Sequence, residues 1–415
     1  MMSGKLMLEE SAFRLRRILL RWLSPITSFG VGILVGVIVN LFTSNDAVSF
    51  RHVLARVSDW SSPLSLLLLG AIGVVSGAWF CERALARYCA RRRWEVKLAA
   101  LGRSRTSPSI APFASSAVSW GDNLTLQLCP RFEEGWRVDE IALRHVKGNS
   151  LYSLPAADAA PYEQFRDENK AARWFRNDNE TCRLAMNPVS FVDAPELNLE
   201  VQRCRYSQVQ FTNHRLATDH TRRQRCLQQA QDGEIPFANV LVVHMVVVTS
   251  DEHILATLSS TKKDYFGNCW SFSIEEQLRV DDLSNNNVTV HGRIAQWIDR
   301  ALVEELGVTR TDYLVENVRA LSVFIEGHNL NCGLCCVVRL SIDAATTGAM
   351  IAATLRQDYE FTNYNFYTFD QAVDMLRSPT LPLHPTSEYR LLLALNHLLT
   401  PPTLARRLFV QAGRH

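Results

Sequence analysis

Two uninterrupted apolar stretches lie near the N-terminus of the chain. Ile26–Phe42 and Leu64–Cys81 contain no charged residue, and each is close to the roughly 17–25 residues that cross a hydrocarbon core. A helix with one face in water needs polar residues on that face. The pattern therefore predicts a membrane protein with a transmembrane hairpin, whose helices we place at residues 25–43 and 63–81 around a periplasmic loop at 44–62.

The rest of the chain shows shorter periods, typical of a domain with both strands and helices. Val240–Val248 is a continuous apolar run, as expected for a strand buried on both faces. His291–Leu306 has apolar residues at helical spacing and is followed by Gly307, a common helix stop. Further strands are predicted at 197–216, 253–259 and, as a pair, within 320–342, and further helices at 370–376 and 386–399.

Basic residues are distributed unevenly around the two apolar stretches. Five Lys or Arg precede the first stretch, two lie in the connecting loop, and eight follow the second. Because positive charge stays on the cytoplasmic side, both termini are expected in the cytoplasm. We expect a basic amphipathic segment at 1–24, a basic juxtamembrane helix and linker at 82–116, and a cytosolic domain at 117–415 with its core at about 190–400.

Glycines recur at a spacing of four within both apolar stretches. Such pairs make a flat strip that lets two helices approach closely, although glycine is common in membrane helices generally. The strips predict transmembrane packing within the hairpin or between protomers, through Gly32, Gly36, Gly73 and Gly77.

The composition narrows the chemistry that the domain can perform. The net charge is +2, and most of the basic excess lies beside the apolar stretches, so DNA binding is not expected. Among the ten cysteines, Cys332, Cys335 and Cys336 form a cluster, but no second pair or histidine completes a zinc site. Buried thiols on a strand, in a reducing compartment, are the expectation.

The segment ending at Val308 resembles the last part of a Nudix box. That family pattern reads Arg-Glu-apolar-x-Glu-Glu-x-Gly-apolar, and six positions match it here: Arg300, Leu302, Glu304, Glu305, Gly307 and Val308. The resemblance implies an α/β domain with a mixed sheet between helices. It also implies that Glu304 and Glu305 are ligands of a magnesium ion beside a nucleotide diphosphate, so magnesium is a possible cofactor.

The departures from the box bear on catalysis. Ala301 replaces the glutamate after the arginine, and Gly292 and Asn286 stand where an earlier glutamate and glycine are expected. Glu275 and Glu276 resemble the family's loop glutamates, but an insertion through 279–287 separates them from the helix. A diphosphate-cleaving site needs several carboxylates to hold magnesium, so we expect hydrolysis to be lost. If the domain is hydrolytic, its catalytic residues are Glu275, Glu276, Glu304 and Glu305.

Two membrane helices followed by a degenerate Nudix domain resemble the membrane effectors of cyclic-oligonucleotide-based anti-phage signalling, which carry a SMODS-associated NUDIX domain. The resemblance implies a cyclic oligonucleotide ligand made by a partner nucleotidyltransferase, homo-oligomerisation, and permeabilisation of the inner membrane in abortive infection. The main alternative is a membrane-anchored Nudix hydrolase of a nucleoside diphosphate derivative. A third is a scaffold that places a protein-binding domain at the membrane.

The residues that would bind a nucleotide are harder to identify. Lysines after a strand can meet phosphates or simply line a solvated turn, and aromatic residues can stack on a base or pack in a core. His244, within an apolar run, is expected to be a core histidine rather than a ligand. The nucleotide-binding candidates are Arg300, Glu304, Lys262, Lys263, Tyr364 and Phe366.

Overall fold

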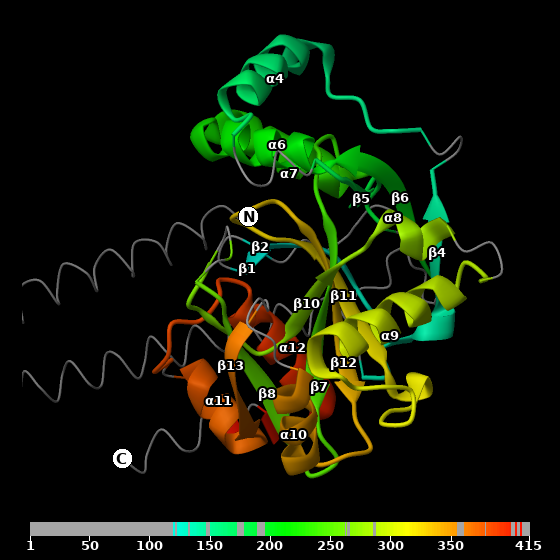
Figure 1. Cartoon of the computed structure of the whole chain (residues 1–415), viewed down its shortest axis with the longest axis vertical. Coiled ribbons are helices and arrows are strands. Elements are labelled where there is room, and N and C mark those ends of the chain that lie inside the picture. Colours follow the sequence, from blue (N-terminus) through cyan, green and yellow to red (C-terminus); the bar gives the residue numbers. More distant parts are fainter. Residues whose placement is uncertain are drawn as a thin grey trace, which may run out of the picture. The chain divides into compact units, whose positions relative to one another are not determined.

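The computed structural model describes most of the chain from Ser119 onward (Figure 1). All described residues belong to one compact unit, which runs from Val96 to His415. The segments expected at 1–116, including the two apolar stretches and their glycine strips, lie outside the described residues, as do Lys262 and Asn286. The described ranges are 119–120, 123–131, 133–146, 150–171, 178–188, 196–261, 263, 266–284, 288–354, 361–377, 379–399, 403–404 and 407–408.

A large mixed sheet forms the centre of this unit. Its main path runs β1-β2-β11-β12-β7-β8-β13, with β3, β9 and β10 paired at its sides. The central pair, β7 and β12, is parallel, whereas the other pairs are antiparallel. The strands are β1 (Ser119–Trp120), β2 (Asn123–Leu128), β3 (Trp136–Arg137), β7 (Leu241–Val248), β8 (His253–Ser259), β9 (Trp270–Ser271), β10 (Ile274–Gln277), β11 (Arg319–Ile325), β12 (Cys332–Arg339) and β13 (Phe361–Thr368).

Helices cover the two faces of this sheet. On β7, Val243 belongs to the same buried cluster as Trp297 of α9, whereas the next residue, His244, contacts Arg390 of α12. Because successive side chains of a strand point to opposite faces, α9 and α12 lie on opposite faces of β7. The helices are α4 (Ala156–Glu168), α6 (Tyr206–Thr218), α7 (His220–Asp232), α8 (Val280–Ser284), α9 (Gly292–Leu306), α10 (Ala344–Thr354), α11 (Phe369–Arg377) and α12 (Ser387–Leu398), with single 3₁₀ turns η1 (Val138–Glu140) and η2 (Val315–Asn317).

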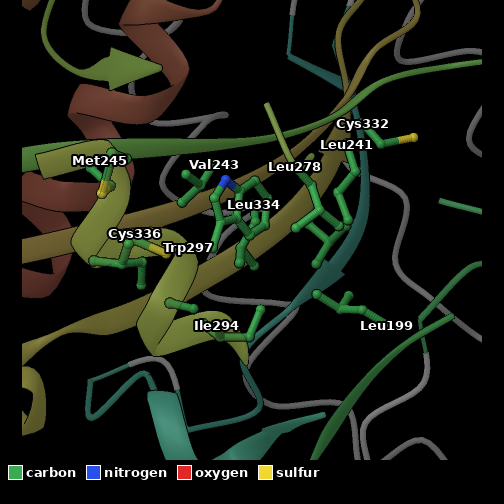
Figure 2. Close-up of a cluster of buried hydrophobic side chains, with 14 of the residues drawn as sticks. Leu199, Leu241, Val243, Met245, Leu278, Ile294, Trp297, Cys332, Leu334 and Cys336 are labelled. Atoms are coloured by element: carbon green, nitrogen blue, oxygen red, sulfur yellow. The ribbon is translucent and has the colours of Figure 1, made fainter. Parts of the chain in front are cut away.

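The core between α9 and the sheet belongs to one continuous hydrophobic cluster. Figure 2 shows Ile294 and Trp297 of α9 beside apolar side chains of β7 and β12. Both α9 side chains are fully buried, as are Leu241, Val243, Met245, Leu334 and Cys336. This packing fixes the position of α9, and with it the glutamates at its C-terminal end.

A smaller sheet and three helices pack beside the main sheet. Its strand order is β4-β6-β5, from β4 (Ile141–His145), β6 (Leu197–Arg205) and β5 (Glu180–Leu184). Figure 1 shows α4, α6 and α7 gathered at one end of the unit. Leu199 of β6 joins the same core cluster as α9 (Figure 2), so the two sheets share one hydrophobic core.

Most sequence-based elements of the domain are confirmed. The strands over 240–248, 253–259 and 320–342, and the helices over 291–306, 370–376 and 386–399, appear at nearly those bounds. The strand expected over 197–216 is half wrong, because β6 ends at Arg205 and α6 begins at once. Asp178 accepts a hydrogen bond from the Ser207 amide at the first turn of α6, and this distant partner favours a helix there.

The expected fold class, a membrane protein with a transmembrane hairpin, is wrong as a description of this structure. None of the described helices combines the length and the apolar composition needed to span a bilayer. The longest, α9, has 15 residues and rises only about 22 Å, which is less than a hydrocarbon core of about 30 Å. The apolar face of α9 packs in the core described above. The fold class is α/β.

Candidate functional site

The Nudix-like glutamates lie at the C-terminal end of α9, which a left-handed glycine terminates. Gly307 has φ of +71°, and the Val308 amide donates to the Leu302 carbonyl. This arrangement satisfies carbonyls that the helix end would otherwise leave unpaired. A Cβ on Gly307 would also collide with Thr354 of α10. The matched glycine therefore has two structural roles, which explain its presence independently of catalysis.

Ala301, at the position of the missing glutamate, points into the protein interior. Its side chain is fully buried and belongs to the main core cluster. Glu305 lies one turn later on the same face and is 7% exposed. A carboxylate at position 301 would therefore have to enter the apolar core or displace it.

Arg300 is the centre of a partly buried ion-pair cluster on α9. Its guanidinium donates to Glu276 at 2.6 Å and to Asp282 at 2.8 and 2.9 Å. The side chains of both acids are only 5% exposed. Burial alone would lower the pKa of Arg300, but the hydrogen bonds to Asp282 and Glu276 raise it above its ordinary value. Arg300 is thus already engaged by protein carboxylates.

The insertion between β10 and α9 contributes residues to the same cluster and pairs with Glu304. Arg279, the first residue of the insertion, donates to both oxygens of Glu304 at 2.7 and 3.0 Å. Arg300 also approaches Glu304 at 3.3 Å. Asp282 lies on α8, within the insertion. The insertion therefore supplies one cation and one anion, and Glu304 faces two guanidiniums.

A second polar cluster is buried on the other face of the sheet, around Arg390 of α12. This arginine is fully buried. It donates to Glu275 at 2.5 Å, to Ser273 at 2.6 Å and to Ser271 at 3.0 Å. The ring nitrogens of His244 and His384 also lie within hydrogen-bond distance of its guanidinium, at 2.5 and 3.2 Å. A single cation thus holds the segment around β9 and β10 against α12.

The acids of the Arg390 cluster are held ionised. Burial alone would raise the pKa of Glu275, but the charge of Arg390 lowers it well below its ordinary value. Glu326 lies 3.2 Å from His244 Nε2, and this contact outweighs burial and lowers the pKa of Glu326. Burial lowers the pKa of His384 to about 4, so that ring is neutral near pH 7. His244 is the core histidine that the sequence suggested.

A small cavity of about 40 Å³ lies beside Glu275. Two carboxylates line it, Glu275 from β10 and Glu305 from α9. Cationic and polar groups complete the wall: Lys263, His384, Thr257, Ser259, Ser271 and Ser273. Three less polar side chains close it: Phe266, Phe361 and Cys269, with Ile274 at the base. The cavity is large enough for one small group, such as a phosphate or the edge of a base.

The residues present do not fit the magnesium centre that the Nudix resemblance implies. Glu304 is paired with Arg279 and Arg300, Glu276 with Arg300, and Glu275 with Arg390. Within the described ranges, no three His, Cys, Asp or Glu side chains come together as metal ligands. A guanidinium cannot be deprotonated at neutral pH, and it competes directly with a cation for the same oxygens.

The structure brings some of the sequence candidates together and separates others. Arg300, Glu304 and Glu276 share the α9 cluster, whereas Glu275, Glu305 and Lys263 line the cavity. Tyr364 and Phe366 lie on the edge strand β13, pack against the core and touch each other edge to face. The Tyr364 hydroxyl donates to the Gly348 carbonyl of α10 at 2.9 Å. These two rings therefore lie outside the cavity lining.

The cysteines behave as the sequence suggested. Cys332, Cys335 and Cys336 are buried on β12 as free thiols. Burial raises the pKa of Cys335 to about 12. These thiols are therefore packing residues.

Sequence reasoning missed the arginine partners and the aromatic wall of the cavity. Arg390 is separated from Glu275 by 115 positions, and Asp282 from Arg300 by 18. No short-range pattern marks the first pair, although an arginine directly before the apolar run Leu391–Leu395 is a signal that a buried partner exists. Phe266 has φ of +53°, an unusual conformation for a bulky residue.

Comparisons with known proteins give weak structural similarities alone. No family model and no curated protein sequence matches the chain. A crystal structure from Deinococcus radiodurans is similar over 36% of this chain and 80% of its own, with 16% identity and a TM-score of 0.26. The MutT protein from Methanosarcina mazei Go1 is similar over 39% of this chain and 96% of its own, with 11% identity and a TM-score of 0.28.

A Nudix hydrolase from M. smegmatis, RenU, is a third similar structure, with 13% identity over 39% of this chain and 82% of its own, and a TM-score of 0.24. Scores and identities this low carry no argument about activity or substrate. The described unit has an α/β fold, and the end of α9 resembles the last part of a Nudix box.

Proposed function

We propose that the Nudix-like unit binds a nucleotide ligand without hydrolysing it, and acts as a sensor. The observation that supports this most directly is the pairing of three of its four Nudix-like glutamates with arginines. Glu276 and Glu304 are neutralised by Arg300 and Arg279, and Glu275 by Arg390. Magnesium-assisted cleavage of a diphosphate needs carboxylates that are available to the metal.

The cavity beside Glu275 offers groups suited to one part of a nucleotide. Lys263 supplies a cation for a phosphate, and the hydroxyls of Ser271 and Ser273 can accept or donate hydrogen bonds. Phe266 and Phe361 supply aromatic surface for stacking on a base. Because the cavity is only about 40 Å³, the ligand inserts one group and leaves the rest at the mouth.

The proposed ligand is a cyclic oligonucleotide, and the proposed output is a change in assembly. Support for this choice comes from the resemblance to the sensor domains of anti-phage signalling effectors. A ligand shifts an assembly equilibrium only through its differential affinity for the two states. Binding between protomers of a homo-oligomer would supply that difference.

The experiment is a thermal-stability and light-scattering series on the full-length chain, with a panel of cyclic di- and trinucleotides. A ligand that binds only the folded state raises the melting temperature. We expect one class of cyclic nucleotide to raise it and to increase the particle mass, and Lys263→Gln to weaken both effects. Lys170→Gln, which removes an exposed lysine outside the cavity, is the matched control. If no cyclic nucleotide stabilises the chain, the sensor proposal is wrong.

A hydrolase acting on a nucleoside diphosphate derivative is the second candidate. Glu275 and Glu305 line the same cavity, and this is the feature that favours it. The hydrolase would release product in magnesium and lose this activity in Glu305→Gln. The sensor proposal expects no turnover in either protein.

A further inference from the structure

A second, larger cavity lies away from the Nudix-like glutamates, at the end of the main sheet where β3, β11 and β12 meet. Its volume is about 410 Å³, within the range of about 300–1,000 Å³ typical of small-molecule sites. No residue of its wall lines the cavity beside Glu275. The wall is formed by Arg131, Glu133, Glu134, Gly135, Arg137, Glu140, Asn317, Arg319, Val337, Arg339 and His397. We call it the arginine groove.

Strand register brings three of these arginines onto one face of the sheet. Arg137 of β3 is directly opposite Arg319 of β11. Arg319 is in turn opposite Val337 of β12, and Arg339 follows two residues later, where side chains return to the same face. Like charges directly opposite each other destabilise a sheet. An anion between them would remove that cost.

The carboxylates of the wall do not neutralise all four arginines. Arg131 takes up both Glu134, at 3.0 Å, and Glu140, at 2.8 Å. Arg137 pairs with Asp139 at 3.1 Å. Arg339 has no carboxylate partner among the residues described, and its side chain is exposed. The wall carries four guanidiniums and three carboxylates, and Asp139, which pairs with Arg137, lies beside it.

The backbone holds Arg319 in position for a ligand. Its guanidinium donates to the carbonyl oxygens of Glu316 and Val318, which carry no net charge. Its stem lies against Gly135, where φ is +71° and an added Cβ would come within 2.9 Å of the Arg319 Cβ. Glycine at this turn therefore makes room for the arginine and restricts its motion. A side chain ordered before binding loses less entropy on binding.

We propose that the arginine groove binds a small molecule through a phosphate group. A guanidinium presents a planar fork of donors that matches phosphate oxygens in pairs. Within the described part of the chain, Arg319 and Arg339 are the wall arginines without a carboxylate partner. The volume suits a compact ligand such as a nucleotide or a sugar phosphate. This site is independent of the proposed sensor cavity and of its ligand.

The test is calorimetric titration of the full-length chain with inorganic pyrophosphate and, in a second arm, with adenosine monophosphate. We expect both to bind, and Arg339→Gln and Arg319→Gln each to weaken binding by about tenfold or more, since hydrogen bonds to charged groups are the strong ones. Arg144→Gln removes an exposed arginine on β4 and is the matched control, expected to bind as the unchanged protein does. If adenosine monophosphate binds more tightly than pyrophosphate, the groove also contacts the part of the ligand that carries the phosphate.

Three results would overturn the proposal. The first is that neither pyrophosphate nor adenosine monophosphate binds. The second is that Arg339→Gln binds them as tightly as the unchanged protein does. The third is that Arg144→Gln weakens binding as much as Arg339→Gln does, which would indicate non-specific attraction. Thermal melts of each variant without ligand identify folding defects, and Arg339→Gln keeps the test valid if Arg319→Gln unfolds. Binding of an acidic peptide but of neither phosphate compound would also reject it.

Discussion

Ala301 is the residue at which the end of α9 departs most clearly from the Nudix box that it resembles. The alanine is fully buried on α9, one turn before Glu305. Its methyl group packs in the main core, where an ionised group without a partner is costly. The loss of the glutamate is therefore matched by the packing around it, and restoring the residue type does not restore the site.

The first prediction concerns Ala301→Glu. We expect the free energy of unfolding to fall by more than about 2 kcal/mol, because a carboxylate enters the core unpaired, and we expect no gain of magnesium-dependent hydrolysis. Chemical denaturation measures the first effect and product release the second. Val303→Glu is the control, because Val303 lies on the same helix and is 45% exposed. It should change the free energy of unfolding by less than about 0.5 kcal/mol. Turnover by Ala301→Glu would contradict the account.

The second prediction concerns Arg390→Met. Removing this fully buried cation leaves Glu275 without its charge partner. Breaking a buried ion pair costs about 3–5 kcal/mol, and we expect a loss of that size in urea denaturation. Adding Glu275→Gln should recover part of it, because the orphaned charge is then removed. A double variant as unstable as the sum of the two single variants would show that the pair is not coupled.

The third prediction is a pH dependence through His384. Its pKa in the folded protein is lowered to about 4, against about 6.5 in an unfolded chain. Between these values the unfolded state binds more protons, so stability is full above about pH 6.5 and falls as the pH drops toward 4. The lowered pKa values of Glu275 and Glu326 act in the same direction at lower pH.

Melting temperatures measured from pH 7 to pH 4 check this dependence. His384→Gln should flatten the dependence of melting temperature on pH above about pH 5. His220→Gln, at an exposed position on α7, should leave that dependence unchanged. A curve that His384→Gln does not alter would assign the acid sensitivity to other groups.

At the scale of elements, the end of α9 joins two helices through one glycine. Gly307 adopts a left-handed conformation and lies against Thr354 of α10. The fourth prediction is that Gly307→Ala lowers the free energy of unfolding by at least about 1 kcal/mol, from the φ of +71° and the collision together. Thr354→Ala should relieve part of this loss in the double variant. If Gly307→Ala lowers the free energy of unfolding equally in the unchanged background and in Thr354→Ala, backbone strain accounts for the whole loss.

Elements were predictable from sequence where a pattern is local. Val240–Val248 is apolar except for His244 because β7 is covered on both faces, and α9 carries its apolar residues at helical spacing up to Gly307. The segment after Arg205 was not predictable in this way. Its alternating residues suit a strand, but Asp178 and the Gln208 side chain, which accepts from the Arg205 amide, begin a helix. One of those partners lies far away in the sequence.

The site was predictable only in part, for the same reason. The partial box located α9 and its glutamates, because a helix keeps residues four apart on one face. It gave no information on Arg279 and Asp282 from the insertion, or on Arg390 from the last long helix. These partners lie beside the glutamates only in the folded arrangement of the sheet and helices. Two of them, Arg279 and Arg390, are cations that donate hydrogen bonds to Glu304 and Glu275.

At the scale of the whole molecule, the described unit combines a Nudix-like scaffold with two separate polar cavities. One lies beside Glu275 and Glu305, and the other is bounded by the arginines of β3, β11 and β12. The main core cluster joins both sheets and α9, and strands of the main sheet contribute to both walls. Binding at either cavity can therefore stabilise the whole unit, and the variants Lys263→Gln and Arg339→Gln assign an observed effect to one of them.

Phosphorus NMR of a cyclic dinucleotide, mixed with the full-length chain and magnesium, tests the central claim most directly. The account predicts that the phosphate resonance shifts or broadens on binding and that no product resonance appears. A new product resonance, produced by the unchanged protein and absent with Glu305→Gln, would contradict it and establish a hydrolase.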